Sequence, residues 1–341
     1  MNLLPLLQHT VSPHVKRYTS TKIKNSATPA AVYRLTVAYN GSSNGTYTAK
    51  PCTLILKRIC PHWLDDPGFS DREARFYACL LPRLDIPHPH IYYTGLDPDT
   101  QDRLILMEDL TGYHLPPPTR PWTQAEGHCL ARAYARLHAD KGRVLPPEDE
   151  RGWLMARHES RLEPGRISNM VSDLVQQNVW EPIPCLESLL ARTVDAARTF
   201  TQLPATLLHN DVYPPNVALP LDLDGDAILL DWEMASWGRA EMDLAFMFLQ
   251  PYRAHKLLDR ARVLDTYWAA RHALEGEIPA CEERETRQFY ADAVWGFWLV
   301  PVAHRMAAHP FPPGSVVDTY WKSMFGVLQD HLQRLSRDIL L

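Results

Sequence analysis

The chain has 341 residues, of which 45% are hydrophobic and 22% are charged, the composition of an ordinary globular protein. This length favours two lobes over a single core. The formal net charge of -5 argues against a nucleic-acid surface, and no apolar run approaches the roughly 20 residues of a membrane helix. We therefore expect no nucleic-acid or membrane partner.

The cysteines are scattered and form no C-x-x-C pair, which predicts reduced, mostly buried thiols in a cytoplasmic protein. The short apolar patch from Met1 to Leu7 lacks a basic leader and a small-residue cleavage site, so it does not read as a signal peptide. The six cysteines are Cys52, Cys60, Cys79, Cys129, Cys185 and Cys281.

The first third of the chain is mainly strand-like. Alternation or apolar runs predict strands over Tyr33–Val37 and Thr53–Lys57, with a turn at Asn40–Gly45 between them. A further hairpin is predicted from Ile91–Tyr93 and Leu104–Met107. Between these strands, helical spacing and a capping Ser70 or Asp71 predict a helix over 70–81.

Pro116–Pro121 is the clearest linker, because proline extends neither a helix nor a strand. Beyond it, apolar stripes predict helices around Leu130–His138 and Leu186–Val194. A hairpin around the Asp224-Gly225 turn interrupts this helical region. The pattern predicts an α+β fold with a small β-rich lobe (1–110), a hinge near 106–121 and a larger helical lobe (111–341).

The segment from Leu207 to Glu233 carries the strongest chemical signal. Asp211 and Asn216 stand in H-x-D-x-x-x-x-N spacing after an apolar run, and Asp231 ends a later run. Phosphoryl transfer from ATP needs such a set. One carboxylate accepts the proton of the acceptor hydroxyl, while an amide oxygen and a second carboxylate hold Mg²⁺.

Each of these residues also has a plainer interpretation. Asp211 and Asn216 are common turn formers beside Pro214-Pro215. His209 is expected to brace the loop as a buried group and not to carry protons. The joint spacing of Asp211, Asn216 and Asp231 favours the catalytic interpretation.

Lys57 ends an apolar strand, where a charge needs a reason. It can reach the α and β phosphates of a nucleotide while Glu73, on the following helix, holds it by an ion pair. The alternative is an edge-strand lysine that points to water. Extended backbone from Leu106 to Leu110 can offer a carbonyl and an amide to adenine, or can simply be a strand that ends in a turn.

Taken together, these segments resemble the aminoglycoside phosphotransferase and choline kinase-like family, which has the protein-kinase fold. The resemblance runs from about Val32 to just beyond Asp243. The segments that carry it are Leu56-Lys57, Arg72–Tyr77, Leu106–Leu110, Leu130–Ala139, His209–Asn216, Leu230–Glu233 and Asp243–Ala245.

The resemblance implies a catalytic base, a metal site and a nucleotide site in this chain. It implies Asp211 as the base, Asn216 and Asp231 as Mg²⁺ ligands, and Lys57 with Glu73 as the phosphate-positioning pair. It further implies that backbone at Glu108 and Leu110 holds adenine and that Asp243 braces the catalytic loop.

The nucleotide loop departs from the family, because Asn25–Pro29 contains no glycine. Hydroxyl groups of Ser26 and Thr28 are expected to replace part of the backbone contact with phosphate, and the choice between ATP and GTP stays open.

The expected activity is ATP- and Mg²⁺-dependent phosphorylation of a small-molecule hydroxyl, on an aminoglycoside-like antibiotic, a sugar or an amino alcohol. The alternatives are a non-catalytic nucleotide-binding protein and a protein kinase, although no D-F-G or A-P-E triplet is present. Aromatic and acidic residues of the last third can either receive a cationic acceptor or form helix core and a solvated face. They are Trp268, Tyr290, Trp295, Trp298, Trp321, Glu275, Glu277, Glu282, Glu283 and Glu285.

Overall fold

The protein is a mixed α+β chain, as the sequence predicts, and it divides into two compact units. The first unit comprises Met1–Tyr113 with Asp231–Glu233, and the second comprises His114–Leu230 with Met234–Leu341. This computed structural model describes residues 2–25, 30–40, 52–60, 69–117, 120–139, 152–154, 162–201, 205–249, 258–277, 279–308 and 316–338.

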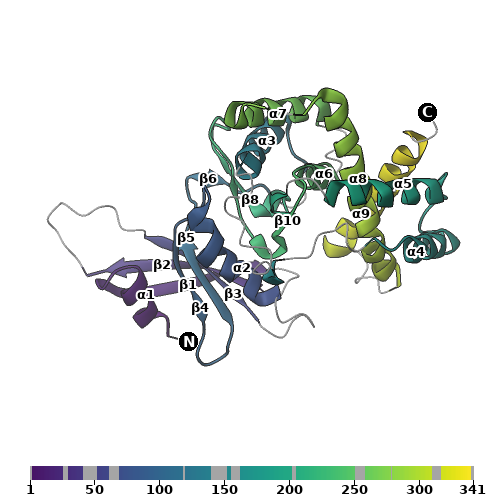
Figure 1. Cartoon of the computed structure of the whole chain (residues 1–341). Coiled ribbons are helices and arrows are strands. Elements are labelled where there is room, and N and C mark those ends of the chain that lie inside the picture. Colours follow the sequence, from purple (N-terminus) through teal and green to yellow (C-terminus); the bar gives the residue numbers. More distant parts are fainter. Residues whose placement is uncertain are drawn as a thin grey trace. The chain divides into compact units, whose positions relative to one another are not determined.

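An antiparallel five-stranded sheet forms the first unit, in the order β1-β2-β3-β5-β4 (Figure 1). The strands predicted over 33–37 and 53–57 and the predicted hairpin are all confirmed. The strands are β1 (Val15–Asn25), β2 (Ala30–Tyr39), β3 (Thr53–Ile59), β4 (Ile91–Leu96) and β5 (Arg103–Glu108).

A short helix, α1 (Leu4–Thr10), precedes the sheet and was not predicted, since its apolar patch is too short to show a helical period. Leu7 is fully buried in one cluster with Leu35 and Leu54 of the sheet. The N-terminal patch is therefore a cover for the sheet. The predicted turn beyond Asn40, and the loop residues Ser26 and Thr28, lie outside the described residues.

The predicted helix over 70–81 is present but changes its winding. The α-helix α2 (Phe69–Arg75) passes into a π-turn at Phe76–Leu80 and a 3₁₀ turn at Leu81–Arg83. The Leu81 amide bonds the Phe76 carbonyl, and Pro82 has no amide hydrogen with which to continue an α-helical ladder. The wider turn buries Phe76, Tyr77 and Leu80 together.

Helices dominate the second unit. The helices predicted around 130–138 and 186–194 are confirmed as α3 and α5, and the predicted hairpin is confirmed as β8 and β9, with Val217 opposite Leu229. Its helices are α3 (Gln124–Ala139), α4 (Pro164–Gln176), α5 (Leu186–Thr201), α6 (Glu241–Leu249), α7 (Arg260–Glu275), α8 (Cys281–Ala308) and α9 (Val316–Asp338). Its short strands are β7 (Thr206–Leu208), β8 (Val217–Pro220), β9 (Ile228–Leu229) and β10 (Ser236–Gly238), while β6 (Tyr113–His114) lies at the boundary of the units.

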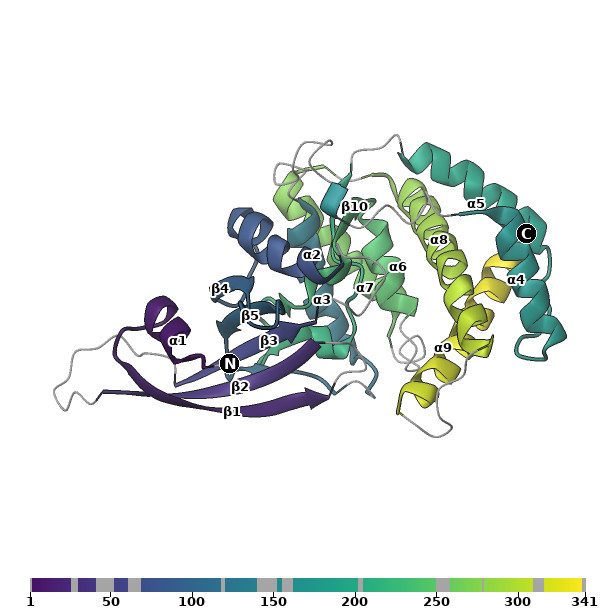
Figure 2. The same cartoon turned by 90° about the horizontal axis from the view of Figure 1, so that it is seen from below.

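The core of the second unit lies where α8 packs against α4, α5, α6 and α9 (Figure 2). Trp295 at its centre is fully buried, and its indole nitrogen donates to the Met242 carbonyl oxygen at 2.7 Å. A second pair, α3 and α7, lies side by side. These contacts fix α3 and α6, the two helices that support the loop carrying Asp211.

The cysteines are all free, as predicted, but the expectation that most are buried is wrong. Only Cys129 is buried, on α3, and the other five are exposed. Among the helices that the structure describes, none is long and apolar enough to cross a membrane.

His331 on α9 gives the fold a testable dependence on pH. Burial lowers the pKa of this imidazole from 6.5 to about 4, and the ring contacts the Asp292 carbonyl oxygen at 3.0 Å. Between these two values the unfolded chain binds a proton that the folded chain does not, so the free energy of unfolding falls as pH drops from about 6.5 to about 4. The loss attributable to His331 is on the order of 3 kcal/mol.

Replacing His331 with Gln is expected to flatten this acid decline, measured by chemical denaturation at several pH values. His272→Gln, at an exposed position on α7, serves as the matched control and retains the decline. An unchanged slope in the His331 variant would rule out this residue as the cause.

Candidate active site

A charge cluster around the buried Lys57 and Glu73 lies in the first unit. The Lys57 ammonium of β3 lies 2.6 Å from Glu73 Oε2 of α2 and 2.7 Å from Asp231 Oδ1. The predicted ion pair between Lys57 and Glu73 is therefore formed, and Lys57 is buried, not pointing to water. Asp231, which lies 174 positions later in the sequence, is a second partner of the same lysine.

Burial and the neighbouring charges shift the pKa values of Lys57 and Glu73. Burial raises the pKa of Glu73 to about 7, opposed by Lys57 and reinforced by Asp231. Burial alone would lower the pKa of Lys57, but Asp231 and then Glu73 hold it well above its ordinary value. The ammonium therefore stays charged, and the cluster carries an excess of negative charge.

Glu233 adds a third carboxylate that the sequence analysis missed. Ligand oxygens of Glu73, Asp231 and Glu233 lie within 4.8 Å of one another. With one lysine among three carboxylates the formal charge is about -2, and hard oxygen donors of this kind suit Mg²⁺. The residues of this cluster therefore fit a divalent cation, and Lys57 already engages one oxygen each of Glu73 and Asp231. The sequence signal that could have identified Glu233 is the second acidic residue in Asp231-Trp232-Glu233.

Packing fixes the segment that carries these two carboxylates. The Trp232 ring is fully buried and stacks on Phe76, with ring centroids 4.1 Å apart and an interplanar angle of 9°. The Arg72 guanidinium donates to the Glu233 carbonyl oxygen at 2.8 Å. Asp231 itself has a φ of 65°, a left-handed conformation that costs a non-glycine residue free energy and needs such surroundings to persist.

The loop predicted to be catalytic lies in the second unit, after β7. The Asn216 side-chain amide donates to Asp211 Oδ2 at 2.8 Å and to the Asp211 carbonyl oxygen at 2.9 Å. This fixes the carboxylate of Asp211. The side-chain nitrogen of Asn216 is engaged by these two bonds. The side-chain oxygen of Asn216 is therefore the atom able to ligate a metal.

Asp243, at the start of α6, braces the loop from behind. Its Oδ2 accepts from the His209 amide at 2.9 Å, and its Oδ1 accepts from the Asn210 amide at 2.7 Å. His138 of α3 contacts the same carboxylate at 3.1 Å, and burial lowers the pKa of this imidazole, so its neutral ring donates through Nε2. Asp243 thus forms the hydrogen bonds to the loop that its implied bracing role requires.

His209 is the buried structural group that the sequence predicts. Its side chain is fully buried, and Nε2 lies 2.9 Å from the Leu230 carbonyl oxygen, so this nitrogen must be the donor. Nδ1 then accepts from the Asp211 amide at 3.2 Å. Both ring nitrogens are occupied by the backbone, which leaves His209 no free site for carrying a proton.

The segment Glu108–Leu110 ends β5 with part of its backbone already bonded. The Glu108 amide donates to the His90 carbonyl oxygen at 2.9 Å, and the Leu110 carbonyl oxygen accepts from the Tyr113 amide at 3.0 Å. Asp109 between them is buried and paired with Arg34 at 2.7 Å. The Glu108 amide is therefore not open to an adenine held here.

Comparison with known proteins decides the family. The pattern that defines the phosphotransferase enzyme family matches residues 35–284. The chain belongs to this phosphotransferase enzyme family. None of the curated proteins has a matching sequence.

Solved structures of low sequence identity share the fold of this phosphotransferase. A proposed aminoglycoside phosphotransferase from Ralstonia eutropha JMP134 has 15% identity and a TM-score of 0.62, over 97% of both chains. Choline kinase from Cryptosporidium parvum Iowa II has 11% identity and a TM-score of 0.59, over 99% of this chain and 95% of the other. Spectinomycin phosphotransferase, solved with ADP and spectinomycin, has 12% identity and a TM-score of 0.53, over 97% and 98%.

Five of the aromatic and acidic candidates for the acceptor site separate into two groups. Trp295 is fully buried in the helical core, and Trp298 packs against it with ring centroids 5.0 Å apart, so the helix-core interpretation holds for both. Trp268, Glu275 and Glu277 instead line a cavity of about 520 Å³. The side chains of Glu282 and Trp321 lie outside the described part of the chain.

This second group does not form a simple cation site. The same cavity is lined by Arg239, Arg271 and Arg287, and Arg271 is paired with Glu275 at 2.5 Å. Guanidinium groups therefore offset the carboxylates. The cavity gives no preference for the cationic acceptor that the sequence suggested.

Replacing Asp243 with Asn tests the brace of the loop in this phosphotransferase. An amide nitrogen in place of one carboxylate oxygen faces a backbone N–H donor, so one buried amide loses its acceptor. We expect a loss of about 3 kcal/mol in the free energy of unfolding and a lower kcat. Chemical denaturation and hydrogen exchange at the His209 and Asn210 amides measure the effect. Asp265→Asn, at an exposed site on α7, is the control, and equal stability of the two variants would contradict the role given to Asp243.

Proposed function

We propose that this protein transfers the γ-phosphate of a nucleoside triphosphate, with Mg²⁺, to a hydroxyl group of a small molecule. The observation that carries the proposal is the intact acidic and basic set. Lys57, Glu73 and Asp231 form one ion-paired cluster, and Asn216 holds Asp211 in a braced loop. Phosphoryl transfer depends mainly on positioning and on neutralising charge, and these groups supply both.

Each group has a defined part in the proposed reaction. Asp211 accepts the proton of the acceptor hydroxyl while the oxygen of that hydroxyl bonds to the γ-phosphorus. The bond from that phosphorus to the bridging oxygen breaks, and the nucleoside diphosphate leaves. Lys57 contacts the α and β phosphates, and Asn216 and Asp231 would ligate Mg²⁺, which neutralises phosphate charge.

Adenine recognition is proposed for the backbone of Glu108 and Leu110. The ion pair of Asp109 with Arg34 supports this by fixing the residue between them. Ser26 and Thr28 are proposed to contact phosphate. Because base recognition through backbone does not by itself select adenine, GTP is a competing donor.

Two alternatives are less well supported. In a protein kinase the substrate-recognising segment follows the metal-binding Asp, but α6 begins at Glu241, only ten residues after Asp231. A non-catalytic nucleotide-binding protein would have no need of a fixed base, whereas the Asp211 carboxylate is held by Asn216.

The decisive experiment measures nucleotide consumption with a panel of acceptors. The full chain is incubated with Mg²⁺ and either ATP or GTP, alone and with aminoglycosides, macrolides, choline and small sugars. A diphosphate must appear together with a phosphomonoester signal in ³¹P NMR, and chelation of the metal must stop both. Acceptor-independent hydrolysis alone, or no turnover with any acceptor class, would count against the proposal. The responding acceptor also distinguishes a role in antibiotic resistance from one in metabolism.

A further inference from the structure

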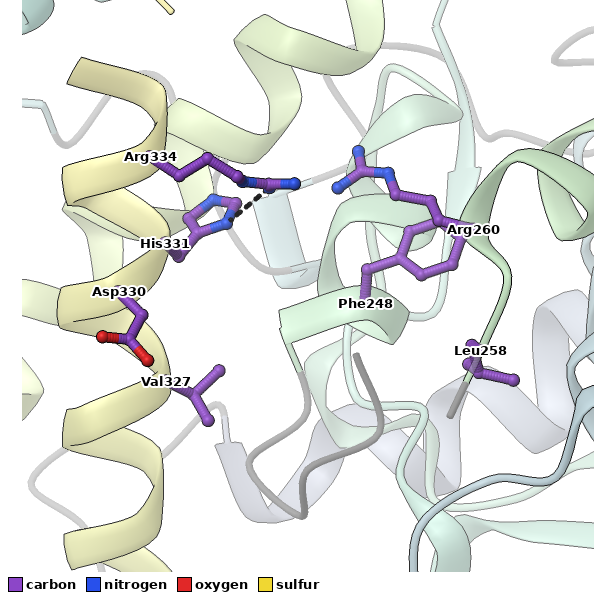
Figure 3. Close-up of a pocket in the computed structure, with 7 residues that line it drawn as sticks. All are labelled: Phe248, Leu258, Arg260, Val327, Asp330, His331 and Arg334. Carbon is purple, nitrogen blue, oxygen red and sulfur yellow. Dashed lines mark hydrogen bonds between the residues drawn. The ribbon is translucent and has the colours of Figure 1, made fainter. Parts of the chain in front are cut away.

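A second cavity lies in the helical unit and is formed by residues that the proposed reaction does not use. It encloses about 200 Å³. Figure 3 shows its walls: Phe248 of α6, Leu258 and Arg260 at the start of α7, and four residues of α9. The α9 residues are Val327, Asp330, His331 and Arg334.

One part of the cavity is apolar. Phe248 and Leu258 are buried, and Val327 is half-buried. The Arg260 guanidinium carbon stands 4.7 Å from the centroid of the Phe248 ring, which orients this side chain over the apolar part. A dry apolar cavity of about 150 Å³ accepts benzene, so this one is large enough for a single ring or a short aliphatic chain.

The other part carries converging positive charge. The guanidinium groups of Arg260 and Arg334 point toward each other in Figure 3, whereas the Asp330 carboxylate points away from both. Arg260 is ion-paired with the buried Asp292. Within the part of the chain that the structure describes, Arg334 forms an ion pair with no carboxylate. Its guanidinium lies 3.2 Å from the His331 ring, within hydrogen-bond distance.

His331 holds the Arg334 guanidinium at the cavity. Its Nε2 lies 3.0 Å from the Asp292 carbonyl oxygen and must therefore carry the hydrogen. Nδ1 then presents a lone pair, to which Arg334 donates. The imidazole is neutral, because burial lowers its pKa to about 4, so it positions the guanidinium without adding a charge of its own.

We propose that this cavity binds a small organic carboxylate with an apolar body. The carboxylate lies between Arg260 and Arg334, and the apolar body lies against Phe248 and Leu258. Guanidinium groups bind carboxylates through paired, charge-assisted hydrogen bonds, and a bound anion removes the repulsion between the two arginines. None of the residues that line this cavity belongs to the set assigned above to phosphoryl transfer.

Benzoate is a suitable probe, titrated into the full-length protein by calorimetry. Arg334→Gln is the test variant, because Arg334 is exposed and its loss should not affect folding. Arg337→Gln is the matched control, three residues on along α9, exposed and bonded to its own helix at the Gln333 carbonyl. Losing one charge-assisted contact should weaken benzoate binding by about tenfold or more in Arg334→Gln and leave Arg337→Gln within about twofold.

Matched ligands separate the two halves of the site. Acetate keeps the charge and lacks the ring, and benzylamine keeps the ring and reverses the charge, so both should bind about tenfold more weakly than benzoate. Val327→Phe should fill the cavity and block benzoate without changing any charge. The proposal fails if wild-type protein does not bind benzoate, if benzylamine binds equally well, or if Arg334→Gln and Val327→Phe both bind it normally.

Discussion

Turnover by an Asp211→Asn variant is expected to fall roughly a thousandfold, while the affinity for nucleotide stays near that of the wild type. Asparagine keeps the shape of the side chain and can still accept a hydrogen bond from Asn216. It cannot accept the proton of the acceptor hydroxyl. The loss should therefore appear in kcat, measured with the acceptor that the panel identifies, and not in the dissociation constant of the nucleotide.

Asp224→Asn is the control for this variant, because Asp224 is exposed in the turn between β8 and β9. It removes the same charge from a neighbouring part of the same unit. Substantial residual turnover in Asp211→Asn would mean that another group accepts the proton. A matching loss of nucleotide affinity would point instead to damage in the loop.

Replacing Lys57 with Met should have the largest effect on stability. Methionine fills a similar volume but leaves the carboxylates of Glu73 and Asp231 facing each other without the ammonium. Removing one partner of a buried ion pair lowers the free energy of unfolding by about 3–5 kcal/mol. Protonation of Glu73, whose pKa burial already raises to about 7, should relieve part of this cost at lower pH.

The double variant Lys57→Met/Glu73→Gln separates stability from catalysis. It removes one of the uncompensated carboxylate charges and should recover much of the lost free energy of unfolding. It should not recover turnover, since the lysine that contacts the α and β phosphates is still missing. Lys22→Met, at an exposed position of β1, is the control for a strand lysine. A stable single variant, or an active double variant, would contradict the role assigned to Lys57.

Periodic and closely spaced features were predictable from the sequence. The alternation in β2, the apolar run in β3 and the apolar stripe on α3 are long enough to indicate strand and helix. The spacing of Asp211 and Asn216 is a local motif, and the structure places the two side chains 2.8 Å apart. The pair of Lys57 and Glu73 was predictable from the order of elements along the chain.

Features that depend on tertiary contacts were not predictable. Glu233 lies beside Glu73 and Asp231 because Trp232 stacks on Phe76, a contact between segments more than 150 positions apart in the sequence. Trp295 and Trp268 look alike in sequence, but only packing shows that Trp295 is fully buried and that Trp268, also buried, lines a cavity.

The way the chain is shared between the units has a practical consequence. The polypeptide passes from one unit to the other after Tyr113, before Asp231 and after Glu233. A fragment that ends at Tyr113 would keep Lys57 and Glu73 but lose Asp231, and one that starts at His114 would lose the lysine. Dissecting this protein by truncation would therefore produce two incomplete pieces, and any study of nucleotide binding should use the intact polypeptide.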